Sequence, residues 1–308
     1  MTTGGARWAS RGAAMAACAA LAFAAQGCGC DASSNEGATA GTLGSGLASP
    51  HLIAAGRTQV YVTESDGSVR AMAKADGTMT VVSSAVTPVA LAASGDAAAW
   101  ASADEVLVRQ LSAGAPRVVA SRLGGVRAVA IDATNVYWTE RLTGTVAGAP
   151  IAGGATFTLA TGASLDGGLA ADTGTVYWGA GGAVFSATGG EAPVTVATGA
   201  GPVVAIAAAA GHVAWIENDP SGPVLSVAGG TASALAVAPR PAFGALAATS
   251  RGVYVFSDDR TLQLVGWGGG APAPIGTSEY AVGGLAAGDS TVYYTAPNAG
   301  QVFQVVVP

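Results

Sequence analysis

The side chains that most often bind metals or act as nucleophiles are scarce in this 308-residue chain. It contains two histidines, His51 and His212, and three cysteines, Cys18, Cys28 and Cys30. Because all the cysteines lie near the N-terminus, the remainder of the chain offers no thiolate ligand and no disulfide. We therefore expect no zinc or copper site, no catalytic residue of these types and no bound cofactor.

Acidic residues and one arginine are the strongest candidates for ligand binding, because they recur at one position of a repeated pattern. Each follows a short apolar stretch: Glu64, Asp66, Asp104, Glu140, Glu217, Asp219, Asp258 and Arg260. Carboxylates gathered on one face could recruit a cation, a basic peptide or a polyol. The alternative is that turns favour aspartate and that a hydrophobic protein needs charged residues for solubility.

Other common chemistries have little support in the sequence. Ser164 and Ser278 have a glycine two residues before them but lack the glycine that would complete a nucleophile motif. Glycine pairs such as Gly189-Gly190 are typical of turns. The net charge of -6 and the absence of any run of Lys or Arg argue against nucleic acid as a partner.

A sequence unit recurs seven times and must position these residues. Its anchors are spaced by 38, 38, 40, 37, 40 and 39 residues, and they are Val60, Ala98, Val136, Val176, Val213, Val253 and Val292. An aliphatic residue stands seven positions before each anchor, and an alanine always follows it. Insertions are therefore confined to the loops.

Each unit contains four short extended stretches, which in the third unit are 128–131, 135–139, 145–149 and 156–160. Four strands in a period of this length predict an all-β, seven-bladed β-propeller with four-stranded blades. The inner strands should start near residues 52, 90, 128, 168, 205, 245 and 284. Four tryptophans, Trp100, Trp138, Trp178 and Trp215, share one position and are expected to fill the core between blades.

The seventh unit has only three strands before the chain ends. Residues 39–43 precede the first unit in the same relation that 156–160 have to the fourth. We therefore expect this N-terminal strand to complete the last blade, which would close the ring and pair an exposed edge.

The third unit resembles a known repeat. Ala128-Val-Ala-Ile-Asp132, followed by Val136-Tyr-Trp-Thr-Glu140, is similar to the YWTD repeat of low-density-lipoprotein-receptor class B propellers, and more loosely to NHL repeats. Asp132 is matched only by Asp172, so the resemblance is specific only in units three and four. It implies a propeller with six blades, against the seven units counted here, and it carries over no binding residue.

The N-terminus has the features of an export signal. Arg7 and Arg11 precede an apolar run at 13–25, which is shorter than the roughly 20 residues of a membrane-spanning helix. Ala25-Gln-Gly-Cys28 resembles the lipobox of bacterial lipoproteins, in which the cysteine is lipidated, and cleavage by an ordinary signal peptidase is the alternative. These features predict a signal peptide at 1–27, a flexible linker at 28–37 and one propeller domain at 38–308.

These observations favour a non-enzymatic, envelope-anchored β-propeller lipoprotein. We expect a monomer, exported to the cell envelope and held at the outer membrane only by the lipid on Cys28. Its partner would be a protein or a small molecule bound on the loop face. The alternative is a secreted propeller enzyme, a lyase or hydrolase that uses carboxylates and arginines at the axial mouth.

Overall fold

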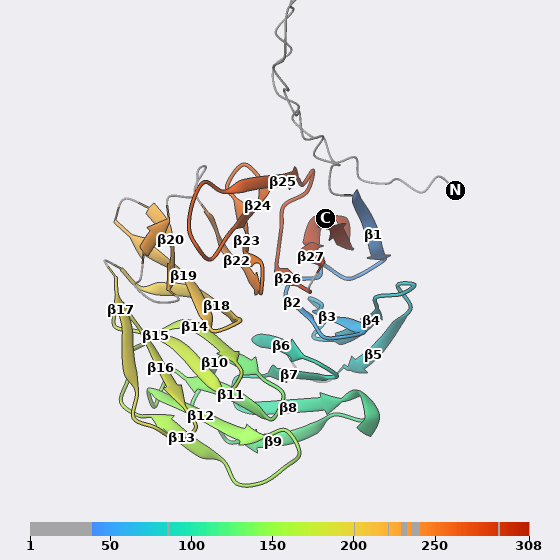
Figure 1. Ribbon diagram of the computed structural model, residues 1–308. Helices are drawn as coiled ribbons and strands as arrows, with labels where there is room; N and C mark the ends of the chain where they lie inside the picture. The colour runs from blue at the N-terminus through green and yellow to red at the C-terminus, as the bar shows by residue number, and fades with distance from the viewer. Residues whose placement is uncertain are drawn as a thin grey trace, which may run out of the picture.

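The computed structural model describes residues 39–84, 87–199, 201–220, 222–228, 233–235, 241–288 and 290–307. Within these ranges the chain forms seven antiparallel sheets of four strands, arranged as blades around a central axis (Figure 1). The predicted seven-bladed β-propeller is confirmed. No helix in these ranges is long and apolar enough to cross a membrane. The predicted signal peptide, the predicted linker and Cys28 lie outside the described residues.

Each of the first six blades is built from four consecutive strands, with the first strand innermost. The strands are β2 (Ile53–Ala55), β3 (Gln59–Thr63), β4 (Val69–Ala73) and β5 (Met79–Ser83); β6 (Ala90–Ser94), β7 (Ala97–Ala101), β8 (Glu105–Gln110) and β9 (Arg117–Ser121); β10 (Val126–Ile131), β11 (Asn135–Glu140), β12 (Thr145–Pro150) and β13 (Phe157–Ala160); β14 (Leu165–Asp172), β15 (Thr175–Ala180), β16 (Ala183–Thr188) and β17 (Val194–Thr198); β18 (Val203–Ala209), β19 (His212–Asp219), β20 (Gly222–Ala228) and β21 (Ser233–Leu235); and β22 (Pro241–Thr249), β23 (Gly252–Ser257), β24 (Thr261–Val265) and β25 (Ala273–Thr277).

The seventh blade combines the two ends of the described chain. It contains β26 (Leu285–Ala287), β27 (Thr291–Ala296) and β28 (Gln301–Val306), and its outer strand is β1 (Thr39–Ser45). β1 runs antiparallel to β28, with Thr39 opposite Val306 and Ser45 opposite Gln301. Each inner strand contacts the next, and β26 contacts β2, so the ring is closed as the sequence predicted. Two short 3-10 turns, η1 (Leu111–Ala113) and η2 (Pro297–Ala299), complete the elements.

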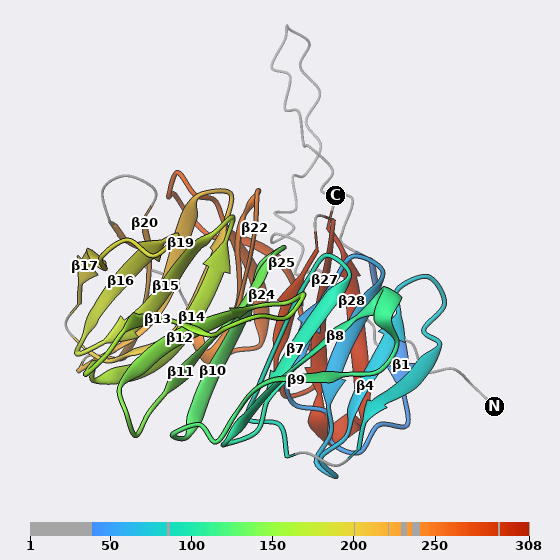
Figure 2. The ribbon, with the colours of Figure 1, turned by 90° about the horizontal axis from the view of Figure 1, so that it is seen from below.

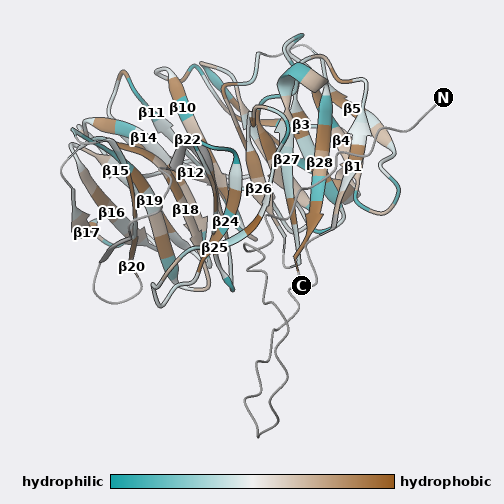
Figure 3. Cartoon of the chain, turned by 90° about the horizontal axis from the view of Figure 1, so that it is seen from above, coloured by the Kyte–Doolittle hydropathy of each residue, from teal (hydrophilic) through white to brown (hydrophobic). Residues whose placement is uncertain are grey.

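The second strand of each blade is buried on both faces, because the sheet lies between two neighbouring blades. In β3, adjacent residues point to opposite faces, yet Val60, Tyr61 and Val62 are all buried. Figure 3 shows hydrophobic residues gathered along the strands. The prediction for the tryptophans is confirmed as well: Trp138 is 1% exposed and packs among residues of the second and third blades, including Ala99.

The inner strands use small residues because they approach one another closely. A Cβ atom placed on Gly168 would lie 2.9 Å from the backbone nitrogen of Ile206 in the next blade. One placed on Gly284 would lie 2.6 Å from the carbonyl oxygen of His51. Close approach explains why the repeat keeps alanine on this strand, as at Ala130 and Ala286, which are both buried.

The strands of every blade run between two ends of the propeller (Figure 2). One end, which we call the loop face, carries the turns between second and third strands and the connections between blades. The other end, the opposite face, carries the remaining turns within each blade. His51 precedes an inner strand at the loop face, whereas His212 begins a second strand at the opposite face, so the two do not share a site.

Candidate functional site

All eight residues singled out in the sequence lie at the loop face, at or just after the ends of second strands. Their surroundings differ greatly. Three glutamates, Glu64, Glu140 and Glu217, occupy one position of the repeat, and Glu64 and Glu217 are buried. Asp66, Asp104, Asp258 and Arg260 are exposed, and Asp219 is half-buried.

Glu64 is held by partners within its own blade. Its carboxylate accepts hydrogen bonds from the backbone N–H of Ala48 at 2.6 Å and from the Ser68 hydroxyl at 2.6 Å, and it forms an ion pair with Arg70. Burial alone would raise the pKa of Glu64, but the hydrogen bonds from Ser68, Arg70 and Ala48 outweigh burial and hold the pKa below its ordinary value. This carboxylate braces the segment that leads into the inner strand.

Glu140 makes the same connection in the third blade. Its carboxylate accepts the N–H of Gly124 at 2.7 Å and the indole N–H of Trp138 at 3.2 Å. Glu217 lies against the corresponding segment of the fifth blade, since a Cβ on Gly199 would fall 1.8 Å from its Oε2 atom. The three glutamates therefore have a structural role at the start of the first, third and fifth blades.

In the fourth blade the carboxylate lies in the segment that opens the blade, and the N–H that it accepts lies in the turn after the second strand. Ala180 stands where the first, third and fifth blades have a glutamate. Asp166, in the segment that opens the blade, instead accepts the N–H of Gly182 at 2.9 Å and that of Val203 at 3.3 Å. The opening segment and the turn are therefore still joined, because a carboxylate in either of them can accept a backbone N–H from the other.

The exposed aspartates shape their own turns. Asp66 accepts the N–H of Ser68 at 2.9 Å, and this hydrogen bond lowers the pKa of Asp66. Asp104 accepts the hydroxyl of Ser102 at 2.9 Å. Both aspartates thus agree with the alternative interpretation of the sequence, in which acidic residues stabilise turns.

Asp258 and Arg260 are brought together at one cavity. This loop-face cavity, of about 360 Å³, lies between the sixth and seventh blades and is lined by Phe256, Ser257, Asp258, Arg260, Ala281 and Val282. Asp258 makes no hydrogen bond or ion pair with any residue that the structure describes. The cavity thus presents an unpaired carboxylate and a guanidinium above an apolar floor.

The turn that carries these two charges is held in place by its neighbours. Asp259 accepts the Ser257 hydroxyl at 2.9 Å and the N–H of Thr261 at 3.0 Å. Arg260 adopts a positive φ of 65° and donates from Nη1 to the carbonyl oxygen of Glu279 at 2.9 Å. That bond ties the sixth blade to the connection that leads into the seventh, so the walls of the cavity are held together.

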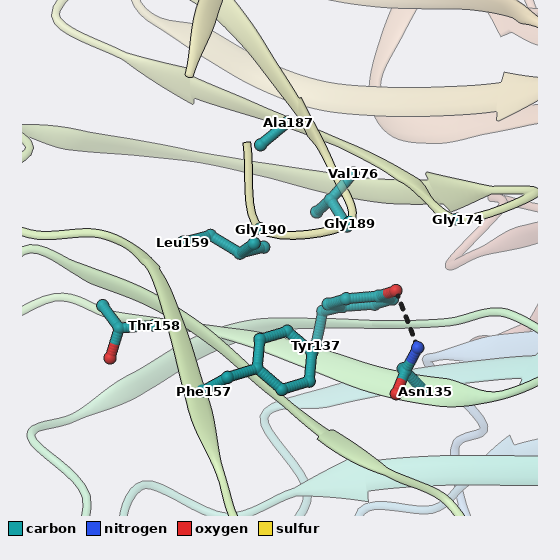
Figure 4. A pocket seen from close by; sticks show the side chains of 10 residues that line it. All are labelled: Asn135, Tyr137, Phe157, Thr158, Leu159, Gly174, Val176, Ala187, Gly189 and Gly190. Carbon is teal, nitrogen blue, oxygen red and sulfur yellow. Dashed lines mark hydrogen bonds between the residues drawn. The ribbon is translucent and has the colours of Figure 1, made fainter. Parts of the chain in front are cut away.

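A second cavity, of about 380 Å³, lies between the third and fourth blades, beside turns of the opposite face at Gly174 and Gly189. Figure 4 shows the side chains that line it. Tyr137 and Phe157 form one wall, Val176 and Ala187 form the other, and Asn135 lies at its edge. The sequence interpretation missed this opposite-face cavity. The sequence carried no distinct signal for it, because Ala187 stands at a repeat position where the third and fifth blades also have alanine, Ala149 and Ala228.

No group of three or more His, Cys, Asp or Glu side chains suited to a metal ion occurs among the described residues. His212 stacks on Trp267, with ring centroids 5.0 Å apart and planes at 15°. Its place between the fifth and sixth blades gives this histidine a packing role.

No protein-family model matches the sequence, and no curated protein matches it. Solved structures with a similar fold include a computationally designed protein, Ika8, with a TM-score of 0.59, 16% identity, and coverage of 87% of this chain and 98% of that one. A chain of a nidogen–laminin complex gives a TM-score of 0.52 and 16% identity over 71% of this chain and 90% of that one.

A third structure is PorZ, described as an essential bacterial surface component of the type-IX secretion system of Porphyromonas gingivalis. It gives a TM-score of 0.65 and 13% identity, over 87% of this chain and 38% of that one. At these identities the similarity concerns the fold alone. The chain is a seven-bladed β-propeller with a charged cavity on its loop face.

Proposed function

We propose that this protein is a non-enzymatic binding scaffold that captures its partner at the loop-face cavity. The observation that carries the proposal is the pairing of Asp258 and Arg260 on one cavity whose floor is apolar. An unpaired carboxylate and a guanidinium would recognise a ligand with a cationic group and an anionic or hydrogen-bonding group. Phe256 and Val282 would pack against the apolar part between those groups.

The enzyme alternative requires carboxylates and arginines that converge on a shared reacting centre. Glu64 and Arg70 meet at the loop face, but the N–H of Ala48 and the hydroxyl of Ser68 also occupy that carboxylate. Asp258 and Arg260 share a cavity without forming an ion pair. This arrangement suits recognition better than acid–base catalysis.

The binding test is affinity capture from envelope extract, read by mass spectrometry, with a soluble Cys28→Ala form of the chain. The matched variants in that form are Asp258→Asn, Arg260→Gln and the control Glu191→Gln, which removes an exposed charge from the opposite face. We expect the captured partner to be lost with either loop-face substitution and retained with the control. Equal capture by all four proteins would contradict the proposed site.

We also propose that the protein is exported and lipid-anchored at the envelope through Cys28. The basic residues, the apolar run and Ala25-Gln-Gly-Cys28 support this proposal. Labelling cells with a fatty-acid probe should mark the wild-type protein and leave Cys28→Ala unmarked. An unlabelled wild-type protein would overturn the anchor without affecting the binding proposal.

Finally, we infer that the blades derive from a YWTD-like repeat. In the third blade, Asp132 accepts the N–H groups of Thr134 and Asn135, each at 2.7 Å, and the Tyr137 hydroxyl at 2.9 Å. This network gives the motif aspartate and tyrosine a joint role in the turn between the first two strands. Homologues that lack both residues in every blade would argue against this origin.

A further inference from the structure

Two small residues shape the opposite-face cavity. Gly148 is one: a Cβ there would lie 2.6 Å from Cζ of Phe157 and 2.8 Å from Cδ1 of Tyr137. Without that Cβ, the Phe157 ring folds over strand β12 and meets Tyr137 edge to face, with centroids 6.1 Å apart and planes at 77°. The two rings thus make a continuous aromatic wall.

Ala187 is the second small residue, and the first blade shows what a larger one does there. Met72 occupies the equivalent position, since it pairs with Val60 as Ala187 pairs with Val176. Met72 is fully buried and packs with Leu43 and Tyr293 across the interface between the seventh and first blades. The short side chain of Ala187 leaves the corresponding space open.

Glycines keep the mouth of the cavity accessible. Gly174, Gly189 and Gly190 line it, and a Cβ placed on any of them would meet no atom within 4 Å. The turns around the mouth therefore carry no side chains at these three positions.

Besides Tyr137, the polar side chains that line the cavity are those of Asn135 and Thr158. Asn135 donates from Nδ2 to the Tyr137 hydroxyl at 3.3 Å (Figure 4) and to Thr134 Oγ1 at 2.9 Å. The Tyr137 hydroxyl in turn donates to Asp132 at 2.9 Å. In this orientation Oδ1 of Asn135 accepts no hydrogen bond from any described residue. Burial, reinforced by Asp132, raises the pKa of Tyr137 well above its ordinary value, so the phenol stays neutral.

We propose that the opposite-face cavity binds a small, uncharged aromatic molecule that carries one hydrogen-bond donor. Its ring would lie between the Phe157–Tyr137 wall and Ala187, and its donor would reach Oδ1 of Asn135. The lining side chains carry no formal charge, which disfavours an ionic ligand. A volume of about 380 Å³ falls within the usual range of small-molecule sites.

The probe for this site is 1-naphthol, with 1-methoxynaphthalene as a matched molecule that lacks the donor. Isothermal titration calorimetry of the wild-type propeller should show saturable binding of 1-naphthol at one site. Ala187→Met should weaken that binding at least tenfold, because it places in the cavity the side chain that Met72 supplies in the first blade. Absence of 1-naphthol binding to wild type, or unchanged binding to folded Ala187→Met, would overturn the proposal.

Asn135→Ala removes the proposed acceptor and also the Nδ2 donor to the Tyr137 hydroxyl, so 1-methoxynaphthalene is the control for a change in the aromatic wall. The substitution should weaken binding of 1-naphthol by about 2- to 10-fold, the range for one neutral hydrogen bond, and leave 1-methoxynaphthalene unaffected. Equal effects on the two probes would contradict the role of Asn135. Asp258→Asn should bind 1-naphthol as wild type does, and a loss there would place the probe in the loop-face cavity and refute this site.

Discussion

Replacement of Glu64 by alanine tests the bracing role of the loop-face glutamates. The substitution removes the acceptor for the Ala48 N–H and the Ser68 hydroxyl and the partner of Arg70. Breaking a buried pair costs about 3–5 kcal/mol. Because 30% of the Arg70 side chain remains exposed, water compensates in part, and we expect a loss of about 2–3 kcal/mol in the free energy of unfolding.

Urea denaturation followed by tryptophan fluorescence measures this loss, with Glu191→Ala as the control. Glu191 is exposed, so its removal should change stability by less than about 0.5 kcal/mol. If Glu64→Ala unfolds at the same urea concentration as wild type, the brace contributes nothing and the structural interpretation of this position is wrong.

The same residue should contribute to acid sensitivity. A carboxylate whose pKa is lowered on folding stabilises the native state fully above its unfolded pKa, near 4.5 for glutamate, and loses that contribution as pH falls through the lower folded value. Wild type should therefore lose stability more steeply than Glu64→Gln as the pH is lowered below about 4.5. Parallel pH profiles for the two proteins would show that the Glu64 charge is not part of the brace.

Three further predictions concern the ring. Gly168→Ala should destabilise the propeller by about 1–3 kcal/mol, because its Cβ would meet Ile206. The control Gly41→Ala should change stability little, since its Cβ would have no atom within 4 Å. Comparable urea midpoints for the two variants would contradict this contrast. Trp138→Ala should cost about 3–5 kcal/mol by chemical denaturation, since it empties the core between two blades, and a smaller loss would indicate that the blades repack. Removal of Thr39–Ser45 exposes the edge of β28 and should cause self-association visible by size-exclusion chromatography; a stable monomer would show that the strand is dispensable for closure.

The sequence predicted the propeller because the repeat encodes each blade locally. The alanine of the inner strand, as at Ala130, and the bulky second strand, as at Tyr137 and Trp138, reflect constraints that every blade shares. The closing strand was also predictable, because a seventh blade with three strands needs a fourth.

The cavities could not be predicted in the same way, since they arise from differences between neighbouring blades. Ala187 is unremarkable in the sequence, and its effect appears only against the wall formed by Tyr137 and Phe157. The roles of the acids were also hidden. Glu64 and Asp258 look alike in sequence, but one is saturated by hydrogen bonds while the other faces a cavity.

Amide hydrogen exchange on the captured complex tests the central claim most directly, because it reports where the partner sits. We predict that binding slows exchange in the turn at 256–261 and in the facing segment at 281–283, which together form the loop-face cavity. Protection confined to other blades, with exchange in these two segments unchanged, would contradict capture at this site.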